Sequence, residues 1–356
     1  MRNVEVVTVV IAGRRYERWE RMTVAAAIDE AVRSFQIETT ERPGEFFAPP
    51  GTPVEIFANG DLLVAGYVNA YEASAEAKSH RILIRGRSKG QDFVDSSAEH
   101  EEGFFEDKTA EEIGQALNKW DIGIRAEVPL DPIPYAQLKP GETAFQMLER
   151  YLRPEGVSMM GTAAGDILLT NAEVARAHYG ILMEGHTIKS FDVSLTDGSR
   201  HSRYIVKGQS RKGGRGARFR IRAEAADRGV KRRRTRILAN ETDTDDRRAR
   251  KRAQHEKERA AGRSVMANVT TQGFRDFAGA LFEPNRLIYV HAPVLMHLVQ
   301  TMLIQRVEWT QDSKAGSEAR LQLVDPRAFK GRGGKGDAPG APESDEVSDP
   351  AWTEGY

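Results

Sequence analysis

The chain has 356 residues, and its 52 Lys and Arg balance its 52 Asp and Glu to a formal charge of zero. This length predicts two or three domains, each large enough to bury a hydrophobic core. The absence of cysteine excludes a disulfide scaffold, a cysteine-ligated metal and a thiol nucleophile, and it suits a reducing compartment.

The first hundred residues have the pattern of short β-strands. Asn59-Gly60 is the strongest two-residue hairpin signal, and it lies between Val54–Phe57 and Leu62–Val64. Thr23–Phe35 fits either a helix or a strand. β-branched and apolar runs predict further strands at residues 4–11 and 81–86. Short strands at close spacing favour a small barrel over a parallel sheet. The apolar run Val6–Ala12 is too short to cross a membrane and lacks the flanks of a cleaved signal.

The middle of the chain has α+β character. Thr109 and Glu112 form the pattern of a capping box at the start of a helix. A second helix is predicted to open at Gly141–Phe145. The first helix is expected to bury a face made of Ile113, Leu117 and Trp120. A hairpin is predicted between residues 156–160 and 167–169.

Strands return after residue 180, with two interruptions. The segment Arg200–Arg236 holds 15 Lys or Arg against only two acidic residues, and we expect it to form a loop. Thr242–Gly262 predicts a polar helix with Asp245 near its start and almost no apolar stripe. Residues 331–356 are rich in Gly, Pro and Asp and predict a disordered acidic tail. The strands are expected at residues 190–195, 204–207, 265–270, 287–291, 302–310 and 319–324.

No catalytic motif emerges from the sequence. There is no Gly-x-Ser-x-Gly elbow, and His255-Glu256 lacks the second histidine of a zinc protease motif. Gly331–Gly336 imitates a phosphate-binding loop without its spacing. Glu99–Glu102 fits a solvated acidic loop better than a metal site. We therefore expect no enzyme activity, no cofactor and no metal.

The basic run has two interpretations. It can contact an acidic protein surface as a solvated segment, or it can neutralise phosphates of nucleic acid without reading sequence. Few aromatic residues are interleaved with the charges, which favours the protein-contact interpretation over base stacking. The candidate contact residues are Arg211, Lys212, Arg215, Lys231, Arg232, Arg233 and Arg234.

Several phrases, taken in order along the chain, resemble the baseplate hub family of contractile phage tails. The Mu-like hub and the related late-control-D tail proteins are the nearest resemblance, together with the N-terminal part of type VI secretion spike proteins. The sequence departs from the pattern of this family at His186-Thr187-Ile188 and at Ser96-Ser97. Neither position has a chemical role. The phrases are found at residues 51–56, 66–68, 84–88, 93–97, 108–113, 140–150, 165–170, 182–188, 202–209 and 319–329.

The resemblance implies an α+β, mainly β fold with two small β-barrel domains and an intervening α+β domain. In such hubs the barrels of three chains form a ring-shaped homotrimer with approximate sixfold symmetry. The ring joins a sixfold tail tube protein to a threefold spike, and the genome passes through its central channel. Symmetry explains why such a protein is needed: a sixfold tube cannot match a threefold spike unless one protein presents both symmetries. The implied location is the virion tail baseplate, after assembly in the host cytoplasm.

On this basis we predict a first barrel at residues 1–97 and a middle domain at 98–180. A second barrel is predicted at 181–330, with the basic loop at 200–236 and the helix at 242–262 inserted. No β-helix follows, so the central spike is expected to be a separate protein. The other expected partners are further baseplate proteins, with DNA only in transit and no membrane insertion. The alternatives are a nucleic-acid-binding protein using 200–236 and, less favoured, a peptidoglycan hydrolase of the tail.

Overall fold

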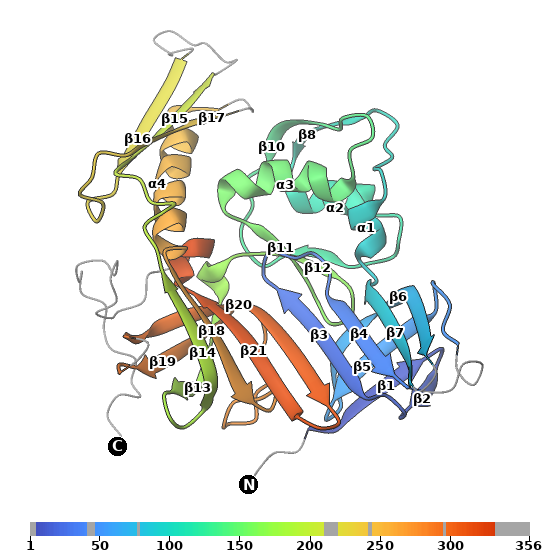
Figure 1. The fold of residues 1–356 in the computed structure, drawn as a ribbon. Coiled ribbons are helices and arrows are strands. Elements are labelled where there is room, and N and C mark those ends of the chain that lie inside the picture. Colours follow the sequence, from blue (N-terminus) through green and yellow to red (C-terminus); the bar gives the residue numbers. More distant parts are fainter. Residues whose placement is uncertain are drawn as a thin grey trace.

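Strands that are far apart in the sequence join in one large sheet (Figure 1). The computed structural model describes residues 5–40, 47–76, 79–209, 220–240, 244–294 and 297–331, and this part of the chain is mostly β-strand. The first part of the chain contributes β1 (Val7–Ile11), β2 (Arg14–Tyr16), β3 (Arg21–Ala27), β4 (Ser34–Thr39), β5 (Pro53–Ala58), β6 (Asp61–Glu76) and β7 (Ser79–Ser88). The last part contributes β13 (Arg176–Met183), β14 (Ile188–Leu195), β18 (Val265–Gln272), β19 (Arg286–Ala292), β20 (Leu298–Asp312) and β21 (Gly316–Val324).

The junction between the two sets of strands is the antiparallel pair β3–β20. Trp309 of β20 lies opposite Val24 of β3, and both side chains are fully buried. β20 is long enough to pair with β3 through one half and with β19 through the other. Strands of the two predicted barrel regions therefore share one sheet and one hydrophobic core.

The local predictions for the first region are confirmed where the alternation of side chains is clear. β1 alternates buried and half-buried residues, as a strand with one core-facing side must. β5 and β6 form the predicted hairpin, and Asn59 and Gly60 both have positive φ, as a two-residue turn of this type requires. The ambiguous segment Thr23–Phe35 is not helical: it contains most of β3 and the start of β4, because β20 and β7 supply pairing partners on either side.

The middle region lies above the ends of β3, β4 and β7 in the view of Figure 1. The capping box of Thr109 and Glu112 is confirmed, and Thr143 with Gln146 forms a second one. Trp120 was expected on the first helix, but that helix ends at Leu117, and Trp120 packs edge-on against Phe93. The elements are α1 (Gln91–Asp95), β8 (Phe104–Lys108), α2 (Ala110–Leu117), β9 (Ile124–Ala126), β10 (Ile133–Gln137), α3 (Ala144–Glu155), β11 (Ser158–Gly161), β12 (Ile167–Thr170) and the 3₁₀ turn η1 (Ala172–Val174).

Apart from the strand predicted at residues 204–207, which is confirmed, the basic run is not the loop that we predicted from its charge. It forms most of a three-stranded sheet with the order β16-β15-β17, covered on one face by a helix (Figure 1). These elements are β15 (Arg203–Gln209), β16 (Arg220–Ala226), β17 (Thr235–Ala239) and α4 (Asp246–Gly262). We call the described residues between Arg200 and Arg263 the basic module. Charge density misled the prediction because the alternate residues of these strands are apolar and find a core under α4.

The end of α4 meets the last described element of the chain, the 3₁₀ turn η2 (Pro326–Phe329). The predicted helix start at Thr242 lies outside the described residues, whereas the expected cap Asp245 accepts a hydrogen bond from the Arg248 N–H. The predicted tail is outside them as well, beyond residue 331. Among the described residues, no helix combines the length and the apolar character needed to cross a bilayer.

Candidate functional site

The basic module contains the site residues predicted from the sequence that can be placed. Lys231, Arg232, Arg233 and Arg234 lie between β16 and β17, whereas Arg211, Lys212 and Arg215 fall outside the described residues. Arg232 forms an ion pair with Asp197, and the Arg234 guanidinium donates to the carbonyl oxygens of Asp197 and Gly198 at 2.9 and 2.8 Å. Two of the four placed cations therefore anchor their own segment, and the exposed Lys231 and Arg233 make no ion pair with the described residues.

The charge of the chain is strongly segregated. Residues 200–263 contain 23 Lys or Arg and 8 Asp or Glu, whereas the rest of the chain contains 29 and 44. The zero net charge is thus the sum of a strongly cationic segment and an anionic remainder. Such an arrangement produces long-range attraction to anionic partners, and that attraction weakens as salt rises.

The inner face of the module is small and apolar. Val206 of β15 and Ile221 and Ala223 of β16 pack against Ala249 and Ala253 of α4. We predicted almost no apolar stripe on this helix, but the alanines form a narrow one, and they allow the helix to lie close to the sheet. Because α4 covers this face, the opposite face of the sheet is left for contacts with other surfaces.

The outer face of the module carries cations around an apolar centre. The strand register shows which side chains share this face. Lys207 of β15 lies opposite Arg222 of β16. Ile205 of β15 lies between Glu224 of β16 and Ile237 of β17. Ile237 is 58% exposed although it belongs to a regular strand. The register thus brings apolar and basic residues together on one surface. The sequence carried a signal for this face, the alternation of charged and apolar residues in 220–225, which we did not interpret as a strand.

Glu224 is an acidic residue on this outer face, and it pairs with two of the neighbouring arginines. It accepts hydrogen bonds from Arg203 at 2.6 Å and from Arg222 at 3.3 Å. The Arg203 guanidinium holds the pKa of Glu224 below its usual range, so the carboxylate remains ionised. Lys207 and Arg220 form no ion pair within the described part of the chain. One carboxylate is therefore shared by two arginines, and the face keeps an excess of positive charge.

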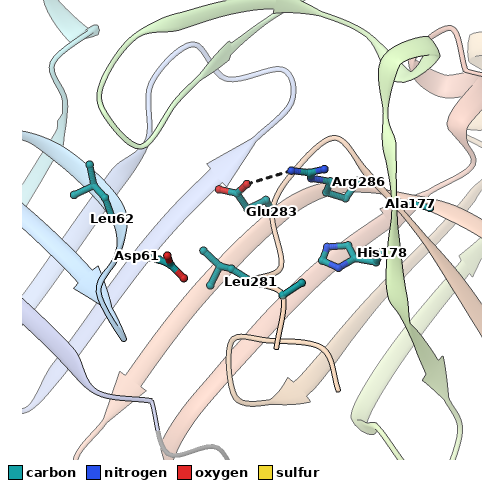
Figure 2. A pocket seen from close by; sticks show the side chains of 8 residues that line it. Asp61, Leu62, Ala177, His178, Leu281, Glu283 and Arg286 are labelled. Carbon is teal, nitrogen blue, oxygen red and sulfur yellow. Dashed lines mark ion pairs between the residues drawn. The ribbon is translucent and has the colours of Figure 1, made fainter. Parts of the chain in front are cut away.

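A separate pocket of about 410 Å³ lies where β6 meets β13 and β19 (Figure 2). His178 lies in its wall, with Nδ1 3.2 Å from the Asp276 carboxylate, and burial lowers the pKa of this histidine. Glu283 pairs with Arg286 at the pocket (Figure 2), and its carboxylate also pairs with Arg33. The lining residues are Asp61, Leu62, Ala177, His178, Ala280, Leu281, Glu283 and Arg286.

The polar groups of this pocket are histidine, arginine and carboxylate side chains. None of its lining residues carries a hydroxyl or thiol that could act as a nucleophile beside His178. Asp276 also accepts hydrogen bonds from the Gly180 and Ala280 N–H groups, which makes it part of the loop structure. In the described part of the chain, no three His, Asp or Glu side chains are grouped closely enough to hold a metal ion.

Comparison with protein families identifies three parts of the chain. Residues 6–88 match the model described as Mu phage baseplate assembly protein GpP-like, N-terminal. Residues 90–171 match the second domain of baseplate hub protein gp44-like proteins. Residues 245–332 match the fourth domain of Mu phage baseplate assembly protein GpP. The three matches follow one another in the order expected for a single type of protein.

Individual relatives agree with these matches. Baseplate hub protein gp44 of Escherichia phage Mu is 24% identical over 91% of this chain and 88% of its own length. The 43 kDa tail protein of prophage MuSo2 from Shewanella oneidensis is 25% identical, with a TM-score of 0.82, over 92% of this chain and all of that one. A tail protein from Neisseria meningitidis has the same fold, with 16% identity and a TM-score of 0.77 over 92% of this chain and 99% of that one. The chain is a homologue of the Mu baseplate hub protein gp44 and belongs to the bacteriophage tail baseplate hub proteins.

Proposed function

We propose that this protein is the homotrimeric hub that joins the sixfold tail tube to the threefold spike of a contractile tail. The observation that carries the proposal is the similarity to the Mu baseplate hub protein over nearly the whole of both chains. The protein is a component of the tail baseplate, and the proposal adds the symmetry, the channel and the partners. Assembly takes place in the host cytoplasm before the tail is completed.

The architecture supports a ring with approximate sixfold symmetry. We assign residues 1–97 and 181–330 to two small β-barrels and residues 98–180 to a middle domain. The pair β3–β20 holds the two barrel regions in one sheet, so each chain would contribute two fixed segments to the ring. Three chains would then present six similar segments to a tail tube and three identical ones to a spike. The central channel is for passage of the genome.

The partners follow from this position. They are the tail tube protein, a separate central spike protein and other baseplate proteins, with DNA present only in transit. A component of the type VI secretion system of Escherichia coli supports the assignment at the level of fold, with 9% identity and a TM-score of 0.56 over 89% of this chain and 76% of that one. Lys231–Arg234, together with Arg211, Lys212 and Arg215, are proposed as contacts to such partners or to the channel.

In this proposal the protein has a structural role in the baseplate and catalyses no reaction. Its relatives are named as tail and baseplate proteins, and the lining of the pocket beside His178 offers no hydroxyl or thiol nucleophile. None of the similar proteins reported above is named as a hydrolase of peptidoglycan. A zymogram with the purified protein is therefore expected to show no clearing.

The experiment that tests the hub is a measurement of mass by light scattering during gel filtration. We expect three times the chain mass of 39.6 kDa, because a ring closed by rotation has a fixed number of subunits. Electron micrographs of the same fraction should show annular particles. A mass of one chain at high protein concentration would contradict the proposal.

A further inference from the structure

The outer face of the basic module has the composition of a protein interface. The exposed Ile237 forms its apolar centre beside the buried Ile205, and Lys207, Arg220 and Arg222 lie around it. An apolar centre with a polar rim is the usual anatomy of a specific contact between proteins. Lys207 and Arg222 lie directly opposite each other, and like charges in such a pair destabilise an isolated sheet. An anionic partner would relieve this repulsion.

A surface with the opposite character lies on the middle region of the same chain. β8 and β10 form a two-stranded sheet in which Phe104 and Tyr135 stack, with ring centres 5.8 Å apart. Tyr135 is 43% exposed, and its cross-strand neighbour is the exposed Glu106. The sequence around this surface is acidic: residues 99–112 hold seven Asp or Glu and one Lys. We call this the acidic aromatic face.

The two faces cannot meet within one chain. The outer face of the module is the side of the sheet that α4 does not cover, and it is α4 that packs against α3 and η2. Arg247 near the start of α4 lies 3.8 Å from Asp131, just before β10. The helix therefore stands between the small sheet and the middle region of its own chain (Figure 1). A partner for the outer face must come from another molecule.

We propose that the outer face of the basic module of one copy packs against the acidic aromatic face of the next copy. Charge and apolar composition are complementary, and both faces exist once on every chain. A contact between two different faces of identical chains generates a ring when the rotation closes. The proposal rests on the trimeric hub proposed above and names the surfaces that join neighbouring subunits.

The chain offers a clean test because it contains no cysteine. The variant Ile237→Cys/Tyr135→Cys places one thiol in each face, at positions exposed enough to leave the fold intact. Treatment with a short bis-maleimide reagent is expected to give covalent dimers and trimers on a denaturing gel, with no larger species. The matched control is Ile237→Cys/Phe277→Cys, since Phe277 is 70% exposed on a different part of the chain. This control, like each single-cysteine variant, should remain a monomer on the gel.

A charge exchange gives an independent measurement. Lys207→Glu and Arg222→Glu, added to the Ile237→Cys/Tyr135→Cys variant, should lower the yield of covalent trimer about tenfold, because acidic residues then oppose each other. Adding Glu106→Lys, opposite Tyr135, should restore part of the yield. Circular dichroism of each variant checks that the fold is retained. An unchanged yield after charge reversal would overturn the proposed contact.

The outcomes separate this inference from the function on which it rests. If the cysteine-free protein is a trimer in solution but the Ile237–Tyr135 pair gives no covalent trimer, the contact is wrong and the hub survives. If the unmodified protein is a monomer, the hub itself fails. If charge reversal leaves the trimer unchanged but abolishes retention on immobilised DNA, the outer face binds polyanions instead, and the proposed contact is overturned.

Discussion

Arg33 shows how much a single buried cation can connect. Its guanidinium donates to the carbonyl oxygens of Leu63 at 2.9 Å and Gly161 at 3.2 Å, and it pairs with Glu283 at 3.4 Å. These three partners belong to the first, the middle and the last region of the chain. Burial lowers the pKa of Arg33, and Glu283 opposes this effect. The arginine therefore joins three regions at the cost of removing a charge from water.

Replacing this residue should cost far more stability than replacing an exposed arginine. Arg33→Met leaves two buried carbonyl groups without their donor and removes one of the two cationic partners of Glu283, and we expect a loss of about 3–5 kcal/mol. The matched control is Arg81→Met, whose exposed pair with Glu38 is screened by water and is expected to contribute little to stability. Urea unfolding of the two variants provides the measurement. Equal midpoints would show that Arg33 does not hold the regions together.

His255 makes the stability of the protein depend on pH. It is buried on α4, and burial lowers its pKa from 6.5 to about 4, with smaller effects from Glu256 and from nearby cations. The ring lies close to Gly156, where a Cβ atom would be 2.6 Å from Nε2. Because the folded pKa is below the unfolded one, the unfolded chain binds the proton first as the pH falls. The stability from neutral His255 is complete above about pH 6.5 and is lost towards pH 4.

We therefore expect His255→Gln to flatten the pH dependence of unfolding. A shift of this size corresponds to about 3 kcal/mol between pH 7 and pH 4, and this part of the loss should vanish in the variant. His178 and the carboxylates continue to titrate in both proteins. The control His186→Gln changes an exposed histidine and should leave the profile as it is. The same slope in all three proteins would argue against a role for His255.

At the scale of elements, α4 packs closely against other elements at two places along its length. Its middle uses Ala249 and Ala253 to lie against the small sheet, and its end uses Gly262 to meet η2. A Cβ atom on Gly262 would lie 2.1 Å from the backbone nitrogen of Ala328. The helix is thus held by small residues at two contacts that are remote from each other in the sequence. A strongly polar sequence hides this requirement.

Gly262→Ala should separate α4 from η2 and destabilise the protein by about 1–3 kcal/mol, since the obstructing atoms belong to the backbone. The control Gly198→Ala introduces the same methyl group at an exposed turn, where the nearest atom is a threonine hydroxyl. Thermal unfolding of both variants measures the difference. If the two melting temperatures fall equally, packing at Gly262 is not the cause.

At the scale of the whole molecule, the zero net charge conceals a cationic module on an anionic body. Such a module can attract an acidic protein surface or the phosphates of nucleic acid. In the proposed hub, a genome channel would gain nothing from a surface that holds phosphates strongly, whereas the proposed contacts between subunits would gain from opposite charges. The mass from light scattering tests the proposed trimer, and cross-linking of the cysteine pair tests the proposed contact between its subunits. Both measurements concern the assembly and not the fold of one chain.

Part of the structure was predictable from local patterns. The hairpin at Asn59-Gly60 and the capping box at Thr109 depend on neighbouring residues, and both are confirmed. The order of short phrases along the chain was enough to indicate the baseplate hub family. Turn chemistry, caps and alternation are short-range properties, so one sequence carries them in readable form.

The remaining features depended on partners that are remote in the sequence. The alanines of Thr23–Phe35 favour a helix locally, but β20 lies almost 300 residues away and captures the segment as β3. The cations of residues 200–236 suggested a loop. In the structure these residues form strands, because α4 covers the apolar side of the strands. Sheet register and burial arise only when distant segments meet, because a strand cannot satisfy its own backbone hydrogen bonds. Sequence alone therefore determined the family and the local elements, and the tertiary structure decided which faces remain available for assembly.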